Sequence, residues 1–228
     1  MITVYSSFKS SRLEYILNFI FKNILEIDFK WTQDYTNLDG VVLNYSDEIL
    51  PCQNYQIQPS GFLVDGNWDF KKYIFLQNKS NYFFPQEKGD HDFDILSSSF
   101  FLITRMEEYH SKDYDEHQRF ISFNSSLVKL SLEQNPIVDQ WCFSLLNLLN
   151  SKFNVELTSP RKFHQYCTFD IDNAYAFKYK SSWRSLGSFF KDLLSFRFYK
   201  LKQRVEFLVG KIKDPYDNYD YILMLYIF

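Results

Sequence analysis

Hydrophobic and polar residues along the first part of the chain follow the period of a strand and then that of an amphipathic helix. Residues 2–5 predict a short strand. Ser11 and Glu14, at the spacing of a capping box, mark the start of a helix after it. The apolar residues of this helix recur on one face. They are Leu13, Ile16, Leu17, Ile20 and Phe21. The pattern predicts a helix that covers a sheet.

Further segments with strand-like composition follow this helix. They lie at residues 27–31, 41–45, 55–57 and 73–76, and an Asp39-Gly40 turn precedes the second of them. Strands that alternate with helices indicate an α/β layer structure. We therefore expect an N-terminal α/β domain with a sheet covered by helices.

Two more helices are expected before a boundary near Pro160. The first opens at Asp94, which can cap free backbone N–H groups, and runs to about Tyr109. A polar loop at 110–118 follows it. The second helix comes after Pro136 and has apolar residues at helical spacing. These are Val138, Trp141, Leu145, Leu148 and Leu149. We expect domains at 1–160 and 161–228.

The second expected domain begins with a strand at 163–169, which is followed by helices at 183–194 and 201–209. Gly210 marks the end of the last helix. Residues 221–228 are apolar without a break. Because a chain end usually lies in water at the surface, this run predicts that the chain is truncated and that it self-associates through the apolar tail.

Composition and charge narrow the class of protein. The 228 residues are 46% hydrophobic and 23% charged, which is ordinary for a globular chain, whereas 25 Phe and 17 Tyr indicate compositional bias or a core rich in rings. The formal net charge of −3, with only a mild basic cluster from Lys178 to Lys213, argues against nucleic-acid binding.

The cellular location is inferred from cysteine usage and from the apolar segments. Cys52, Cys142 and Cys167 are odd in number and widely spaced, which is typical of reduced thiols. Neither a secretory signal nor an apolar stretch long enough to span a bilayer is visible. We therefore expect a cytoplasmic protein.

The strongest chemical signal is the pair Asp170 and Asp172, which directly follows the strand expected at 163–169. Sites in α/β proteins form at the carboxyl ends of strands, and carboxylates at i and i+2 of an extended chain point the same way. Such a pair can hold a divalent metal, or one member can bind the metal while the other takes a proton from water. The alternative is a turn or helix cap, where Asp and Asn are common.

Residues 168–172, Thr-Phe-Asp-Ile-Asp, resemble the first motif of NodB-type polysaccharide deacetylases, Thr-Phe-Asp-Asp-Gly. In that family the motif closes the first strand of a distorted β/α barrel. The resemblance implies that Asp170 is the general base and Asp172 a metal ligand. It also implies that 161–228 form the first strand and helices of an incomplete barrel. The sequence departs from the motif at Ile171 and Asn173.

The region before the motif resembles the uncharacterised N-terminal domain of deacetylase-like proteins of Bacteroidetes. The matching stretches are Phe93-Asp94-Ile95-Leu96, Ser99 to Leu102, Arg105 to Tyr109, Asp115 to Phe120 and Pro136 to Trp141; Asp214-Pro215-Tyr216-Asp217 resembles the linker into the next barrel helix. The resemblance implies a carbohydrate substrate and a divalent metal, zinc or similar, in the complete protein.

This sequence contains no His-x-x-x-His, the second motif of that family. Since a catalytic zinc needs about three protein ligands, we expect this chain alone to bind no metal and to be inactive. A reading frame beyond Phe228 that encodes such a motif would restore the deacetylase. Two alternatives stay open: a glycosyltransferase that uses Asp170-Ile171-Asp172 as a D-x-D motif, and a non-catalytic module in which 1–160 bind a glycan or a partner.

Other polar residues are better explained without a catalytic role. Arg105, Glu107 and Glu108 are expected on a solvated helix end. His110 and His117 flank an acidic loop with Asp113, Asp115 and Glu116, but lack the tight spacing of a metal site. We expect His164 to be packed on its strand and His91 to lie in a loop before a helix cap.

Overall fold

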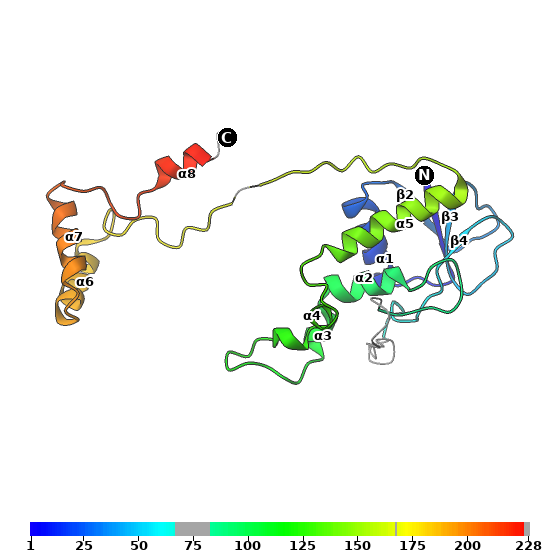
Figure 1. The fold of residues 1–228 in the computed structure, drawn as a ribbon, viewed down its shortest axis with the longest axis horizontal. Helices are drawn as coiled ribbons and strands as arrows, with labels where there is room; N and C mark the ends of the chain where they lie inside the picture. The colour runs from blue at the N-terminus through cyan, green and yellow to red at the C-terminus, as the bar shows by residue number, and fades with distance from the viewer. Residues whose placement is uncertain (67–82, 167, 226–228) are drawn as a thin grey trace. The chain divides into compact units, whose positions relative to one another are not determined.

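The computed structural model describes residues 1–66, 83–166 and 168–225. The chain divides into two compact units, Met1–Lys162 and Phe163–Phe228 (Figure 1). The predicted strand at 73–76 lies outside the described residues.

The first unit contains a parallel four-stranded sheet, which confirms the α/β class. Its strands are β1 (Ile2–Ser6), β2 (Phe29–Thr32), β3 (Val41–Tyr45) and β4 (Tyr55–Gln56), in the order β2-β1-β3-β4. Every residue of β1 and β3 is buried, as expected for central strands of a parallel sheet that is covered on both faces. The strands predicted at 2–5 and 41–45 are therefore confirmed.

The first helical segment has two parts: α1 (Ser11–Leu17), and η1 (Asn18–Ile24), where the backbone widens to π-helical bonds. All five residues of the predicted apolar face are buried, which confirms the amphipathic pattern. The predicted capping box is wrong. Ser10, with extended backbone, is the cap and its Oγ accepts from the Leu13 N–H at 3.0 Å, whereas the Ser11 hydroxyl donates to Asp65 at 3.1 Å.

The helix predicted from Asp94 to Tyr109 is divided in two. Asp94 caps α2 (Ile95–Ile103), as predicted, but Arg105 adopts a left-handed conformation with φ of 54° before α3 (Met106–Tyr109). A left-handed residue cannot continue a right-handed helix, so the chain turns there. Short helical turns η3 (Ser122–Asn124) and α4 (Ser126–Lys129) follow.

The helix predicted after Pro136 is confirmed as α5 (Ile137–Phe153), and it ends where Asn154 becomes left-handed. Helix α2 contacts α1 and α5, and the buried residues of these three helices share one hydrophobic core with β1 and β3 (Figure 1). Between them is a core with many aromatic rings, in which Phe62, Phe83, Phe84 and Phe101 are all buried. Part of the high aromatic content therefore serves core packing.

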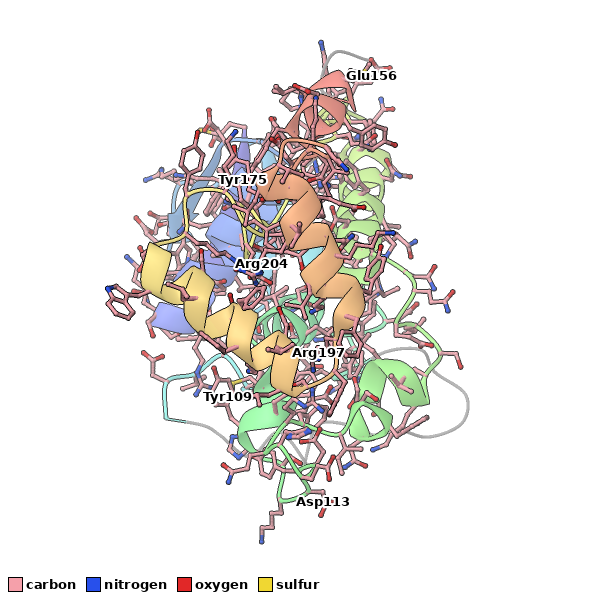
Figure 2. All side chains as sticks on the ribbon, turned by 90° about the vertical axis from the view of Figure 1, so that its left-hand side faces the viewer. Tyr109, Asp113, Glu156, Tyr175, Arg197 and Arg204 are labelled. Carbon is pink, nitrogen blue, oxygen red and sulfur yellow. The ribbon has the colours of Figure 1, made fainter. Side chains whose placement is uncertain are left out.

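The second unit contains α6 (Ser182–Leu194), α7 (Phe198–Leu208) and α8 (Tyr219–Leu225). Helices α6 and α7 pack against each other. Arg204 lies between them and is within 3.4 Å of Asp192, and both side chains are buried (Figure 2). The predicted helix at 183–194 is confirmed. The one predicted at 201–209 begins earlier, at Phe198, and is followed by Gly210 with φ of 71°.

The predicted strand at 163–169 is wrong. Residues 163–166 and 168–169 have no regular secondary structure, and Phe163 and Tyr166 are exposed. A strand needs a neighbour to satisfy its backbone N–H and C=O groups, and the described part of this unit provides none. No helix within the described residues is long and apolar enough to cross a bilayer.

Candidate functional site

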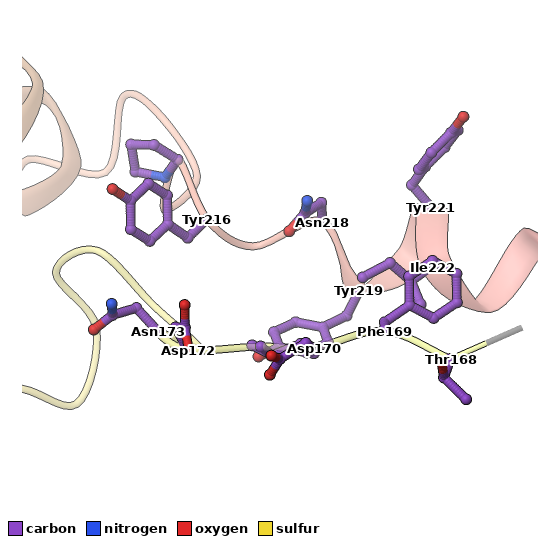
Figure 3. A pocket seen from close by; sticks show the side chains of 12 residues that line it. Thr168, Phe169, Asp170, Asp172, Asn173, Tyr216, Asn218, Tyr219, Tyr221 and Ile222 are labelled. Atoms are coloured by element: carbon purple, nitrogen blue, oxygen red, sulfur yellow. The ribbon is translucent and has the colours of Figure 1, made fainter. Parts of the chain in front are cut away.

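The motif Asp170-Ile171-Asp172 borders an open hollow of about 660 Å³ in the second unit (Figure 3). One wall is the extended stretch of chain that carries both carboxylates. Facing it is the segment that leads from α7 into α8 and carries Tyr216 and Asn218. The lining residues are Thr168 to Asn173, Pro215, Tyr216, Asn218, Tyr219, Tyr221 and Ile222.

Asp170 and Asp172 are both exposed. Among the residues that the structure describes, neither carboxylate has a hydrogen-bond or ion-pair partner. Both residues thus line the hollow, although the strand that was expected to position them is not formed.

Asp214 joins the two walls of the hollow. Its buried carboxylate accepts hydrogen bonds from the backbone N–H groups of Ala176 (2.7 Å), Phe177 (2.7 Å), Lys178 (2.9 Å) and Tyr216 (3.0 Å). Burial by itself would raise the pKa of the Asp214 carboxyl, but these four donors outweigh it and hold that pKa below its usual range. The carboxylate therefore fixes the segment after the motif to the segment before α8.

Aromatic rings reinforce this connection. The Tyr219 hydroxyl donates to the backbone oxygen of Ala174 at 3.2 Å, and the Tyr175 and Tyr219 rings lie 5.6 Å apart between centroids. The Lys178 ammonium lies 5.0 Å from the Tyr175 ring centroid and 5.2 Å from that of Tyr179. The Tyr219 contacts join the start of the stretch that follows Asp172 to α8, and the Lys178 contacts lie within that stretch.

The residues at the hollow do not complete a catalytic metal site. In the part of the chain that the structure describes, no three His, Cys, Asp or Glu side chains come together in a group that could hold a metal ion. A catalytic zinc needs about three protein ligands and an open position, and two neighbouring carboxylates fall short of that number.

The charged residues of the α3 region have structural roles. Arg105 and Glu108 form an exposed ion pair, and Glu107 accepts hydrogen bonds at 2.9 Å from the Ser125 hydroxyl and the Ser126 N–H at the start of α4. Asp115 accepts from the His117 and Arg119 N–H groups, which closes the predicted loop. His164 is exposed rather than packed, because its predicted strand is absent.

Residues 2–154 match the family described as "Family of unknown function (DUF7033)". The chain belongs to this family. The DUF7033 region covers nearly all of the first unit and leaves Asp170 and Asp172 outside it. No curated protein and no solved structure matches the chain.

The DUF7033 region contains a second hollow, of about 440 Å³, that sequence reasoning missed. His91 and Asp92 line it together with Gln140, Trp141 and Ser144 of α5. The Tyr55 hydroxyl lies 2.9 Å from Nδ1 of His91, and burial lowers the pKa of the imidazole, outweighing the opposite effect of Asp92 and Asp94. The sequence showed His91 only as part of a loop, because its partners are brought to it by long-range packing.

Proposed function

We propose that this chain carries the first carboxylate motif of a metal-dependent carbohydrate deacetylase, with Asp170 as the general base and Asp172 as a metal ligand. The proposal rests on the resemblance of 168–172 to the NodB-type motif. One structural observation supports it: both carboxylates are exposed at a hollow and make no hydrogen bond among the described residues. Carboxylates that serve the fold here, such as those of Asp94 and Asp214, accept several hydrogen bonds.

The chain's own residues would bind the sugar and move a proton. Tyr216 and Tyr219 supply rings that can pack against a sugar, and Asn218 supplies an amide donor and acceptor. Asp170 would take a proton from the attacking water. A bound divalent metal supplies polarisation of the acetyl carbonyl in enzymes of this class. As the described residues do not complete its coordination, the proposal includes that this chain alone does not turn over substrate.

A glycosyltransferase is the competing function, and the same observation makes it relevant. A D-x-D motif needs few protein ligands, because the pyrophosphate of a nucleotide sugar supplies further oxygens to the metal. Two carboxylates without a third ligand fit that requirement. The resemblance of the flanking stretches, such as Asp214-Pro215-Tyr216-Asp217, to deacetylase-like proteins favours the deacetylase.

Metal and ligand titrations distinguish these functions. We expect no stably bound metal in the isolated chain. At high Mn²⁺ concentration, however, electron paramagnetic resonance should show weak binding by the two carboxylates that is lost in Asp172→Asn and kept in Asp220→Asn, an exposed carboxylate of α8 that does not line the hollow. An N-acetylglucosamine trimer should give saturation-transfer NMR signals that Tyr216→Ala weakens. Equal Mn²⁺ binding by all three proteins contradicts the proposal. Tighter Mn²⁺ binding in the presence of uridine diphosphate would favour the glycosyltransferase instead.

Hydrolysis of N-acetylglucosamine oligomers tests the inactivity of the isolated chain. We expect no release of acetate with zinc, cobalt or other divalent ions, from either the natural sequence or Asp170→Asn. Metal-dependent turnover that Asp170→Asn abolishes would mean that further side chains of this chain complete the metal site. A cytoplasmic location is part of the proposal, and Cys52 and Cys142, both free thiols, are consistent with a reducing compartment.

A further inference from the structure

Helix α6 presents an apolar face to solvent. Five large side chains at helical spacing lie on one side of it, and all are exposed, with Trp183 at 86% and Leu194 at 79%. The five residues are Trp183, Leu186, Phe190, Leu193 and Leu194. This set is called the α6 apolar face below. Several large apolar side chains exposed on one face of a helix are typical of a surface that binds a protein, a ligand or a membrane.

Contacts with α7 hold α6 in this orientation. The opposite side of α6 carries Asp192, which is buried and ion-paired with Arg204 of α7. Arg204 also donates to the backbone oxygen of Ser185 at 3.3 Å, and its guanidinium lies 5.0 Å from the Phe177 ring centroid. Because these polar contacts are made on the inner side, the α6 apolar face is turned outward.

Helix α7 and its flanks extend the exposed apolar surface. Phe196 and Phe198 are exposed where α6 leads into α7, and Val205, Leu208 and Val209 are exposed along and after α7. The hairpin thus presents aromatic and aliphatic side chains from both helices to solvent.

The same segment contains the basic cluster from Lys178 to Lys213. Ten Lys and Arg residues lie between Lys178 and Lys213, against two acidic residues, in a chain whose formal net charge is −3. The two acidic residues are neutralised locally: Asp192 pairs with Arg204, and Glu206 lies 3.9 Å from Lys202. Among the described residues, Lys191, Arg197, Lys200 and Lys211 are exposed and form no ion pair. The free charge on this surface is therefore positive.

We propose that the α6–α7 hairpin binds the surface of an anionic lipid bilayer, a property beyond the proposed catalytic function. Basic side chains beside a face of Trp, Phe and Leu are the pattern of helices that lie in the membrane interface. Lipid headgroups complement the positive charge, and the acyl boundary accepts the apolar side chains. Leu186, Leu193 and Leu194 favour lipid over nucleic acid, because base stacking uses aromatic rings and not aliphatic side chains. In this pattern the helices lie in the plane of the interface, so the proposed association is peripheral.

Vesicle flotation with the full chain tests this proposal. The chain should float with phosphatidylcholine vesicles that contain roughly a third phosphatidylserine, and at least about tenfold less with pure phosphatidylcholine. Flotation should weaken as salt rises, because the attraction of basic side chains to headgroups is screened. Failure to float with anionic vesicles at low salt would overturn the proposal.

Matched variants test which surface is responsible. Two double variants change the proposed surface: Trp183→Ser with Leu194→Ser on the apolar face, and Lys191→Glu with Lys200→Glu among the basic residues. Each should lower the partition coefficient between vesicles and water about tenfold or more. The control variants change exposed residues of the first unit in the same way: Ile49→Ser with Phe123→Ser, and Lys112→Glu with Lys129→Glu. They should leave the partition coefficient unchanged. Equal losses in test and control pairs would contradict the proposal.

Sedimentation velocity without lipid separates lipid binding from self-association. The natural chain could form a dimer, fail to float, and become monomeric in the Trp183→Ser, Leu194→Ser variant. That result would show that a second copy covers the α6 apolar face, and it would overturn the proposal. A monomeric chain that floats supports it.

Discussion

The Tyr45 hydroxyl donates a hydrogen bond of 2.9 Å to the Asp94 carboxylate, which joins the end of β3 to the start of α2. Asp94 also accepts from the Ser97 N–H and hydroxyl and from the Ser60 N–H, and it is fully buried. Burial and the nearby Asp94 raise the pKa of Tyr45 well above its ordinary value, so the phenol stays protonated and continues to donate.

Breaking this junction should destabilise the first unit. Tyr45→Phe removes one donor to a buried carboxylate and should lower the free energy of unfolding by about 1.5–3 kcal/mol. Asp94→Ala leaves several buried donors without an acceptor and should cost more. Urea denaturation followed by circular dichroism measures both. If Tyr45→Phe is as stable as the natural sequence, the bond contributes nothing.

Leu17 tests the covered face of α1. The side chain is completely buried in the core, so Leu17→Ala should lower the free energy of unfolding by about 2–5 kcal/mol through lost burial and a cavity. The exposed Asn23→Ala in η1 serves as the control and should change stability by less than about 0.5 kcal/mol. Equal melting midpoints for the two variants would contradict the packing described here.

Asp214 should make the second unit sensitive to acid. Its folded-state pKa lies below the value of about 3.9 expected in the unfolded chain, so ionised Asp214 stabilises the fold above about pH 4. That contribution is lost as the pH falls through the folded-state pKa. Asp214→Asn should lower the stability of the second unit at neutral pH and reduce the dependence of that stability on pH in the acid range. NMR of the Tyr resonances of the second unit measures both effects. Asp220→Asn, at an exposed carboxylate, should behave like the natural chain.

The two described thiols should differ in reactivity. Burial, assisted by Asp139 and opposed by Arg161, raises the pKa of Cys142 to about 12, whereas Cys52 is only half-buried. Because the thiolate is the reactive form, iodoacetamide at pH 8 should modify Cys52 and spare Cys142 until the chain is unfolded. Mass spectrometry of the digested protein identifies the modified residue. Modification of native Cys142 at the rate of Cys52 would contradict its burial.

The sequence by itself determined those elements whose periodic pattern is continuous. The apolar face from Leu13 to Phe21, the strand at 41–45 and the helix after Pro136 were predicted because burial of one face leaves a 3.6-residue or strand-like pattern in the residues themselves. Asp94 was recognised as a cap, since its bond to Ser97 is local. The sequence also singled out Asp170 and Asp172, through the resemblance of 168–172 to the NodB-type motif, with a turn or helix cap as the structural alternative.

Only the tertiary structure decided what depends on distant partners. The stretch 163–169 has strand-like residues but no described neighbour to pair with, and strand formation requires a partner that composition cannot reveal. Ser10 rather than Ser11 caps α1, because Ser10 also donates to Leu63, 53 residues away. The sequence showed Asp214 only as part of Asp214-Pro215-Tyr216-Asp217, which resembles a linker into a barrel helix. Its structural role arises because folding brings four backbone N–H groups to its carboxylate. The outward direction of the α6 apolar face likewise follows from the Arg204–Asp192 pair, which forms only when two helices pack.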